Sequence, residues 1–334
     1  MKERRDFLKL MGMGGLMVAA EGFRPLWSVA KDTYPSEKVT WVIPIKPGGG
    51  VDIVARSVSH FLETHLKEAA RGNRSVGIVC KNMPEAGGRK AYSTIFYAKP
   101  DGYTIGDFNT AFITDNIGDK IEFDCSQYTF LVRMGASARI IVANKKKGVR
   151  SWQEMIKLGH QRELKWAVGN YGRGHHVASI LVKETANVPA RLIPFNGGPE
   201  NINALLRGDV DMAILTEEAG KTLINAGEFY VLTSLAEKSE YPGVPSIAQL
   251  GYPELATSLM LERLVIGPPK MPKQVVDILI NCFKKTFTDK EFLAHADKLE
   301  FTPDPLYGTD AERLAKRLFK YYDEKAPVLK KYLS

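Results

Sequence analysis

The sequence predicts an α/β protein of two similar units, each with a mostly parallel sheet flanked by helices. Three observations predict this class. Short apolar runs alternate with segments of helical periodicity, as in sheets whose strands are joined by covering helices. Glycine-rich loops follow several of these runs, and the pattern restarts near the middle of the 334-residue chain. That length suits two domains better than one.

The first unit opens on a buried strand, a loop with three consecutive glycines and a helix from about Asp52. A second strand and helix follow, and then a Pro-Asp-Gly turn leads into a third strand. In chain order these segments are "KVTWVIPI", "SVGIVCKN", "AYSTIFYAK" and "PDGYTIGDFNT".

The second unit repeats this order. Its first helix is expected after Ser151, because Ser151 and Glu154 have the spacing of a capping box. The remaining strands and helices are expected over "LKWAVG", "VASILVKETA", "ARLIPF", "NINALLRG" and "DVDMAIL".

The run "LVIGPP" then returns the chain to the first unit, and the last part is helical by periodicity. We therefore expect residues 36–137 and 265–334 to form one domain and residues 138–264 the other. Two crossings between the domains predict a hinge beside a central cleft.

Residues 1–30 read as an export signal. They combine a basic start, a short apolar stretch and a small-residue site at Ser28-Val29-Ala30. Arg4 and Arg5, followed by "DFLK", are similar to the twin-arginine export motif, although a generic signal with two chance arginines is the alternative. The sequence therefore predicts a protein exported to the periplasm.

The formal net charge is +8, from 46 Lys plus Arg against 38 Asp plus Glu. The basic residues are scattered and carry no nucleic-acid-binding signature, so we expect no nucleic-acid partner. A mild positive field favours anionic small molecules or an acidic partner surface, with an ordinary solvated surface as the alternative.

Neither metal nor cofactor is expected. Cys80, Cys125 and Cys282 are odd in number and widely spaced, which suits neither a disulfide framework nor a zinc site. His175 and His176 are adjacent, and in a helix they would point about 100° apart, unsuited to holding one ion.

The glycine loops predict an anion site. A strand, a glycine loop and a helix together aim several backbone N–H groups at one point, helped by the helix dipole. The triplet after "TWVIPIKP" forms one such unit, "GNYGRG" a second and "FNGGPEN" a third. A tight turn with no ligand is the alternative for any single loop, but loops at the ends of strands in two domains converge on a cleft.

These motifs resemble those of the Bug (TctC-like) extracytoplasmic solute receptors, the binding proteins of tripartite tricarboxylate transporters. The resemblance covers residues 34–330. It rests on six segments in order: "YPSEKVTWVIPIKPGGGVDIVAR", "NMPEAGGRKA", "AKPDGYTIG", "AVGNYGRGHHVA", "IPFNGGPENINALLRGDVDMAI" and "YPGVPSIAQLGYP".

The resemblance implies a two-domain periplasmic binding protein, type II-like, that closes on a small carboxylate and delivers it to the membrane subunits of such a transporter. It implies that the first glycine loop holds one ligand carboxylate through backbone amides and ordered waters, and that loops of the second domain hold the far end. By position, these loops are Pro47, Gly48, Gly49, Gly50, Val51, Asp52, Asn170, Tyr171, Gly172, Arg173, His176, Asn196, Gly197 and Gly198.

Several positions depart from the family pattern. Lys46 replaces a usual proline, Arg173 stands where serine is common, and Val51 lacks the hydroxyl often found there. Either cation could bond a ligand carboxylate, with solvent exposure as the alternative for both.

Thr110, Phe112 and Thr114 are expected to line the cleft in a loop that lacks the family's His and Asn. Thr216 and Glu217 follow a strand at a position where Asp-Asn or Asp-Ser is frequent. A cleft carboxylate would repel a bare dicarboxylate, unless it pairs with Arg173 or with an ammonium group of the ligand. We therefore do not assume citrate: the ligand class stays open between a di- or tricarboxylate, an aromatic carboxylate and an amino acid.

An enzyme is the rival class, because twin-arginine export often serves cofactor proteins. The sequence has no G-x-S-x-G elbow, no Cys–His pairing signal and no cofactor fingerprint, so we expect no enzyme. A receptor that presents its ligand to a signalling partner would share this fold and site. Nothing in the sequence points to an oligomer, so a monomer is expected.

Overall fold

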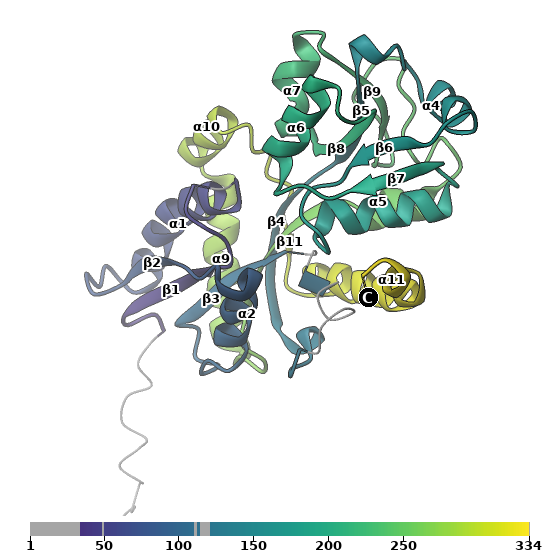
Figure 1. The fold of residues 1–334 in the computed structure, drawn as a ribbon. Helices are drawn as coiled ribbons and strands as arrows, with labels where there is room; N and C mark the ends of the chain where they lie inside the picture. The colour runs from purple at the N-terminus through teal and green to yellow at the C-terminus, as the bar shows by residue number, and fades with distance from the viewer. Residues whose placement is uncertain (1–33, 49, 110–111, 114–120, 334) are drawn as a thin grey trace, which may run out of the picture. The chain divides into compact units, whose positions relative to one another are not determined.

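The computed structural model describes residues 34–48, 50–109, 112–113 and 121–333. The predicted export signal over residues 1–30 lies outside the described residues. Within them, the strands form two sheets with orders β11-β4-β10-β3-β1-β2 and β7-β6-β8-β5-β9 (Figure 1).

The strands of the first sheet are β1 (Lys38–Ile43), β2 (Gly77–Asn82), β3 (Thr104–Asn109), β4 (Thr129–Ser137), β10 (Leu261–Gly267) and β11 (Leu306–Tyr307). Those of the second are β5 (Arg139–Asn144), β6 (Leu164–Ala167), β7 (Ala190–Ile193), β8 (Met212–Thr216) and β9 (Phe229–Ser234).

The two sheets are mixed, which corrects the expectation of mostly parallel sheets. The strands that carry the glycine loops are parallel to their neighbours: β1 to β2 and β3, and β6 to β7 and β8. However, β10 runs antiparallel to β3 and β4, and β5 antiparallel to β8 and β9. The reason is connectivity. The chain enters β5 directly from β4 through Ala138, and it enters β10 from the second half, so neither strand follows a right-handed crossover helix that would make it parallel.

The helices are α1 (Gly50–Ala69), α2 (Arg89–Phe96), α4 (Trp152–Gly159), α5 (Gly174–Thr185), α6 (Gly198–Arg207), α7 (Glu217–Asn225), α8 (Pro253–Ser258), α9 (Lys273–Thr288), α10 (Lys290–Lys298) and α11 (Thr309–Leu333). Three short 3₁₀ turns are η2 (Glu85–Gly88), η3 (Cys125–Gln127) and η4 (Lys145–Lys147). In the described chain, none of the helices has both the length and the apolar character needed to cross a membrane.

Of the two hydrogen bonds of the capping box predicted at α4, one forms as expected and the other has a different donor. Ser151 Oγ accepts a hydrogen bond from the backbone N–H of Glu154 at 3.2 Å, as predicted. The Glu154 carboxylate, however, accepts from the N–H of Arg150 at 2.7 Å, one residue before the helix cap.

The first sheet is buried on both faces, because its side chains alternate between two helix layers. Trp41 and Ile43 point into a core shared with α1, α9 and α10, where Trp41 meets Phe283 edge-on at 5.9 Å between ring centroids. Val42, between them in β1, joins a different core with α2 and α11.

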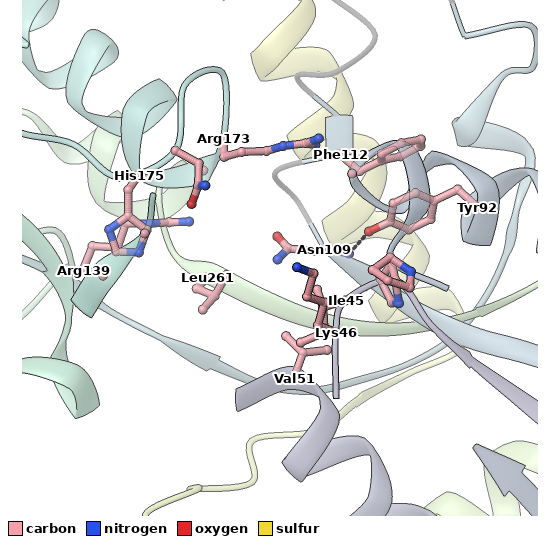
Figure 2. Close-up of a pocket in the computed structure, with 18 residues that line it drawn as sticks. Ile45, Lys46, Val51, Tyr92, Asn109, Phe112, Arg139, Arg173, His175 and Leu261 are labelled. Atoms are coloured by element: carbon pink, nitrogen blue, oxygen red, sulfur yellow. Dashed lines mark hydrogen bonds between the residues drawn. The ribbon is translucent and has the colours of Figure 1, made fainter. Parts of the chain in front are cut away.

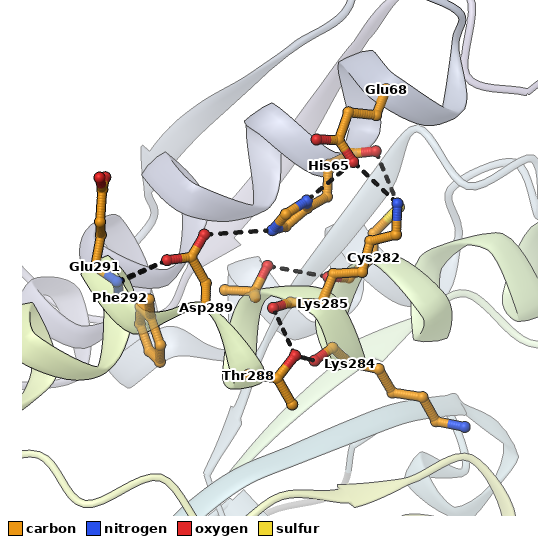
Figure 3. Close-up of polar contacts among 10 residues, drawn as sticks. His65, Glu68, Cys282, Lys284, Lys285, Thr288, Asp289, Glu291 and Phe292 are labelled. Carbon is orange, nitrogen blue, oxygen red and sulfur yellow. Dashed lines mark hydrogen bonds and ion pairs between the residues drawn. The ribbon is translucent and has the colours of Figure 1, made fainter.

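Polar contacts also join α1 to α9 and α10 at the edge of this core (Figure 3). Lys285 Nζ lies 2.9 Å from the Glu68 carboxylate, and His65 Nδ1 lies 3.2 Å from the same group. Asp289 caps α10 through the N–H groups of Glu291 and Phe292. These contacts link α1, the helix that follows the first glycine loop, to α9 at the rim of the core.

The C-terminal helix α11 belongs to both halves of the fold. One hydrophobic core runs from α2 and the first sheet through α11 to α5 and the second sheet, and Figure 1 shows α11 beside α5. Near its end, the Tyr332 carbonyl accepts a hydrogen bond from Tyr171 Oη at 2.8 Å. The strands of the second sheet all lie between residues 139 and 234, and the chain rejoins the first sheet at Leu261. That the two halves move as separate domains about a hinge stays a prediction.

Gly106 provides a stability test, because it lets α2 approach the first sheet closely. A Cβ at this position would lie 2.4 Å from Ile95 Cδ1 and 2.6 Å from the Val42 carbonyl oxygen. We expect Gly106→Ala to lower the free energy of unfolding by about 1–3 kcal/mol, the usual cost of overpacking a core. Urea denaturation measures it. Gly50→Ala is the matched control, since a Cβ there meets nothing within 4 Å; an equal loss in both variants would contradict this packing argument.

Candidate functional site

A cavity of about 580 Å³ lies where the glycine loops of both sheets come together (Figure 2). Its walls come from the segment after β1, the start of α1, η2, α2 and the end of β3, and from β5, the loop after β6, α5, α6 and β10. The lining residues are Pro44, Ile45, Lys46, Val51, Pro84, Gly87, Tyr92, Asn109, Phe112, Arg139, Gly169, Asn170, Arg173, Gly174, His175, Gly197, Gly198 and Leu261. Among these described residues three are cationic and none is acidic.

The first glycine loop is shaped by the buried carboxylate of Asp52. It accepts hydrogen bonds from Gly48 N at 2.9 Å, Asn82 Nδ2 at 2.7 Å and Arg56 Nε at 3.0 Å. Burial opposes the charge, but these hydrogen bonds and Arg56 lower the pKa of Asp52 overall. Asp52 therefore holds the loop from behind, and it is not part of the cavity wall.

The second glycine loop is held by Asn201 of α6, which is fully buried. Its Oδ1 accepts from Gly169 N at 3.0 Å, and its Nδ2 donates to the Ile214 carbonyl at 3.2 Å. His175 Nδ1 also lies 3.2 Å from that carbonyl oxygen. One side chain thus joins the ends of β6 and β8 at the cavity.

Arg173 extends from the start of α5 to η2 of the other half. A Cβ at Gly87 would lie only 1.8 Å from Arg173 Nη2, so the guanidinium rests directly against the Gly87 backbone. Gly87 also has φ of +67°, which favours glycine. In Figure 2 the Arg173 side chain runs across the top of the cavity toward Phe112.

Arg139 is the least expected wall residue. It is only 2% exposed, and it opens β5, in which every residue is buried. One guanidinium nitrogen donates to the Leu259 carbonyl. Nε has no hydrogen-bond partner in the described chain.

An aromatic wall faces these cations. Tyr92 and Phe112 are both buried, with ring centroids 3.6 Å apart. The Asn109 backbone N–H donates to Tyr92 Oη at 3.4 Å (Figure 2). With Ile45, Val51 and Leu261 nearby in the lining, the cavity combines an apolar body with cationic groups.

The structure brings together seven of the residues singled out from the sequence. Those on the cavity wall are Lys46, Val51, Phe112, Asn170, Arg173, Gly197 and Gly198. Those away from it are Pro47, Gly48, Gly50, Asp52, Tyr171, Gly172, His176, Asn196, Thr216 and Glu217. Gly49, Thr110 and Thr114 lie outside the described residues.

The residues away from the wall have structural partners instead. His176 Nδ1 accepts from Gly172 N at 2.9 Å, and Asn196 is held by Glu200, whose carboxylate accepts from its N–H at 3.1 Å. Thr216 caps α7. These side chains shape the loops that carry the lining residues.

Glu217 lies in a different cavity of about 570 Å³, together with Ser137, Glu218 and Arg263. Burial raises the pKa of its carboxyl, which accepts a hydrogen bond from Ser234 at 3.3 Å. The repulsion expected between Glu217 and a dicarboxylate therefore has no basis in the geometry, because no described acid lines the first cavity.

Sequence reasoning missed Arg139, Tyr92, Asn109 and Leu261 as lining residues. One signal was available: Arg139 is a charge inside the otherwise apolar run "ARIIVA". Tyr92 and Leu261 carry no such signal, since each reads as an ordinary core residue of its helix or strand. Nowhere in the described chain do three or more His, Cys, Asp or Glu side chains gather in a way that could hold a metal ion.

Comparison with known proteins identifies the class. Residues 64–330 match the family described as "Tripartite tricarboxylate transporter family receptor" (TctC), and the chain belongs to this family.

The relatives have low sequence identity to this chain, but the alignments cover most of both chains. A UPF0065 protein from the tcbD-tcbE intergenic region of Pseudomonas sp. strain P51 is 26% identical, covering 74% of this chain and 73% of its own. Protein BugT of Bordetella pertussis is 25% identical, covering 83% of each.

Solved structures share the fold. A TctC solute-binding protein from Polaromonas aligns with a TM-score of 0.76 at 18% identity, covering 90% of this chain and 100% of that one. An R. palustris protein with adipate gives 0.69 at 21%, covering 88% and 98%. The Rhodopseudomonas palustris protein MatC with bound malate gives 0.66 at 19%, covering 90% and 100%. The fold is therefore that of two-sheet periplasmic binding proteins.

The histidines at the start of α5 predict a pH dependence. Burial lowers the pKa of both His175 and His176 to about 4, and Arg139 adds repulsion at His175. In the unfolded chain a histidine titrates near 6.5. Between these values the unfolded chain binds protons that the folded chain does not. The contribution to stability is therefore complete above about pH 6.5 and is lost as the pH falls toward 4.

We expect His176→Asn to flatten this dependence, because Asn Oδ1 keeps the bond from Gly172 N–H and cannot be protonated in this range. Denaturant unfolding at several pH values between 4 and 7 measures the slope. His160→Asn, at an exposed histidine, is the matched control. A slope unchanged in His176→Asn would show that this imidazole is not titrating as argued.

Proposed function

We propose that this protein is a periplasmic receptor that captures a small carboxylate in the 580 Å³ cavity and delivers it to a tripartite tricarboxylate transporter. The main support for this proposal is the positive charge of the cavity wall. Lys46, Arg139 and Arg173 line the cavity, and none of its described lining residues is acidic. Such a wall favours an anion over a neutral or cationic solute.

The apolar part of the wall narrows the ligand. Tyr92, Phe112, Ile45, Val51 and Leu261 offer a surface for a hydrocarbon or aromatic body, while the cations take the acid group. Related structures hold adipate and malate, both carboxylates, which supports this ligand class.

Capture is proposed to involve closure about a hinge. The chain crosses between the sheets at Ala138 and again between β9 and β10, and the cavity is lined by loops of both sheets. A ligand that bridges both halves then favours the closed arrangement by its differential affinity for it. Export by the twin-arginine route and delivery to the membrane subunits complete the proposed role.

A thermal-shift screen tests the ligand class. We expect one group of carboxylates, drawn from aliphatic dicarboxylates, tricarboxylates, aromatic acids and amino acids, to raise the melting temperature. Ligand at a hundred times its Kd should stabilise the fold by about 2.7 kcal/mol. Sugars and other neutral solutes are the controls, and a rise with these alone would contradict the carboxylate proposal.

Arg173 should matter for affinity as well. We expect Arg173→Ala to weaken binding of the identified carboxylate by on the order of 1.5–3 kcal/mol, the range for hydrogen bonds to charged groups. Titration calorimetry measures the change. Arg191→Ala is the matched control, because Arg191 is an exposed arginine of the same half that pairs with Glu163 outside the cavity. Equal affinity in both variants would remove Arg173 from the site.

A further inference from the structure

The Arg139 guanidinium lies in the cavity wall with its charge only partly compensated, since Glu262 attracts it without forming an ion pair. It is 2% exposed and makes no ion pair with any described carboxylate. Among the described residues its guanidinium donates one hydrogen bond, to the Leu259 carbonyl, and Nε has no partner there. The nearby acid Glu262 is already engaged by Arg133, whose Nε lies 3.3 Å from its carboxylate.

This arrangement is costly for the empty protein. Removing a guanidinium from water without pairing it carries a desolvation penalty that one neutral hydrogen bond does not repay. Burial lowers the pKa of Arg139, but arginine starts so high that the side chain stays charged at neutral pH. A carboxylate arriving in the cavity would supply both the missing charge and acceptors for the free N–H groups.

His175 lies beside Arg139 on the same wall (Figure 2). A carbonyl oxygen only accepts, so the contact between His175 Nδ1 and the Ile214 carbonyl requires the proton on Nδ1. In the neutral ring Nε2 is then an acceptor, and no described residue donates to it. Burial lowers the pKa of this ring to about 4, which keeps it neutral at pH 7.

The wall therefore presents a strong cationic donor next to a neutral acceptor. We propose that Arg139 binds the ligand carboxylate and that His175 Nε2 accepts a hydrogen bond from a hydroxyl on the adjacent carbon. The ligand class is a 2-hydroxycarboxylate whose apolar body lies toward Tyr92 and Phe112. This inference rests on the proposed function and narrows its substrate.

The charge of the site selects a hydroxyl over an amine at the second carbon. An ammonium could also donate to His175, but it would lie beside the Arg139 guanidinium, which forms no ion pair with any described carboxylate. A simple acid without the hydroxyl would leave the His175 acceptor unpaired. Both analogues should therefore bind more weakly than the hydroxy acid.

The test compares matched ligands by calorimetry on the mature chain: 3-phenyllactate, 3-phenylpropionate and phenylalanine, with malate, succinate and aspartate as the aliphatic set. We expect a preference of about tenfold or more for the hydroxy acid in its set, the value of one hydrogen bond. His175→Asn should abolish that preference, because Asn Nδ2 keeps the bond to the Ile214 carbonyl and no acceptor replaces Nε2.

Arg139→Met should weaken carboxylate binding about 100-fold. Without ligand, its melting temperature should match or exceed that of the wild type, since an unpaired buried charge is removed. Arg133→Met is the matched control: Arg133 is paired with Glu262 and Asp304 away from the cavity, so this variant should lose stability and keep its affinity. Arg139→Lys keeps the positive charge but lacks the planar guanidinium that can donate two parallel hydrogen bonds, so it should bind the carboxylate about tenfold more weakly than the wild type. This variant provides the test if Arg139→Met does not fold.

The outcomes distinguish a failure of the proposed carboxylate-receptor function from a failure of the roles proposed for Arg139 and His175. If the wild type binds no carboxylate of either set or of the wider screen, the proposed function fails. If it binds carboxylates but Arg139→Met or Arg139→Lys binds them equally well, the function stands and Arg139 is a structural residue. If hydroxy, amino and simple acids bind equally, or if His175→Asn keeps the preference, the 2-hydroxycarboxylate class is overturned.

Discussion

Asn201 accepts a hydrogen bond from Gly169 N and donates one to the Ile214 carbonyl, and the second half of the site depends on this pair of bonds. The ends of parallel strands leave backbone groups that must be satisfied when buried. Asp52 does the same for the first half, where it binds Gly48 N and Asn82. In both halves a buried polar side chain holds the glycine loop from behind. The loop is thereby kept in a shape that exposes its front to the cavity.

The positive charge of the cavity wall follows from the way the loops are held. The acids near the glycine loops, Asp52 and Glu200, are used to hold backbone groups and nearby side chains, so they do not line the cavity. The cations lie on the wall instead. Arg139 is the extreme case, since the fold buries its charge and satisfies only part of its hydrogen-bonding capacity. The buried Arg139 charge therefore lowers the stability of the ligand-free fold, and the carboxylate proposed to bind there would restore it.

The same connectivity that makes the sheets mixed also builds the wall. Because the chain passes from β4 through Ala138 into β5, Arg139 stands at the junction of the two sheets and reaches the cavity. The return strand β10 places Leu261 beside it on the same wall. Helix α11 also connects the two halves, because its apolar side chains pack in one core with those of α2 and α5. The residues of the two chain crossings are therefore part of the candidate site.

The sequence by itself determined the α/β class, the family and the glycine loops, because strand and helix periodicity and loop glycines are local signals. It also predicted Lys46, Arg173 and Gly198 as candidate ligand-binding residues, and these line the cavity because they lie in the glycine loops or directly before them. Only the tertiary structure decided that Asp52 faces away from the cavity and that Arg139 and Tyr92 line it. The physical reason is that a side chain's direction depends on which partner across the fold satisfies it. Asn82 lies 30 positions from Asp52 in the sequence, and Leu259 lies 120 positions from Arg139.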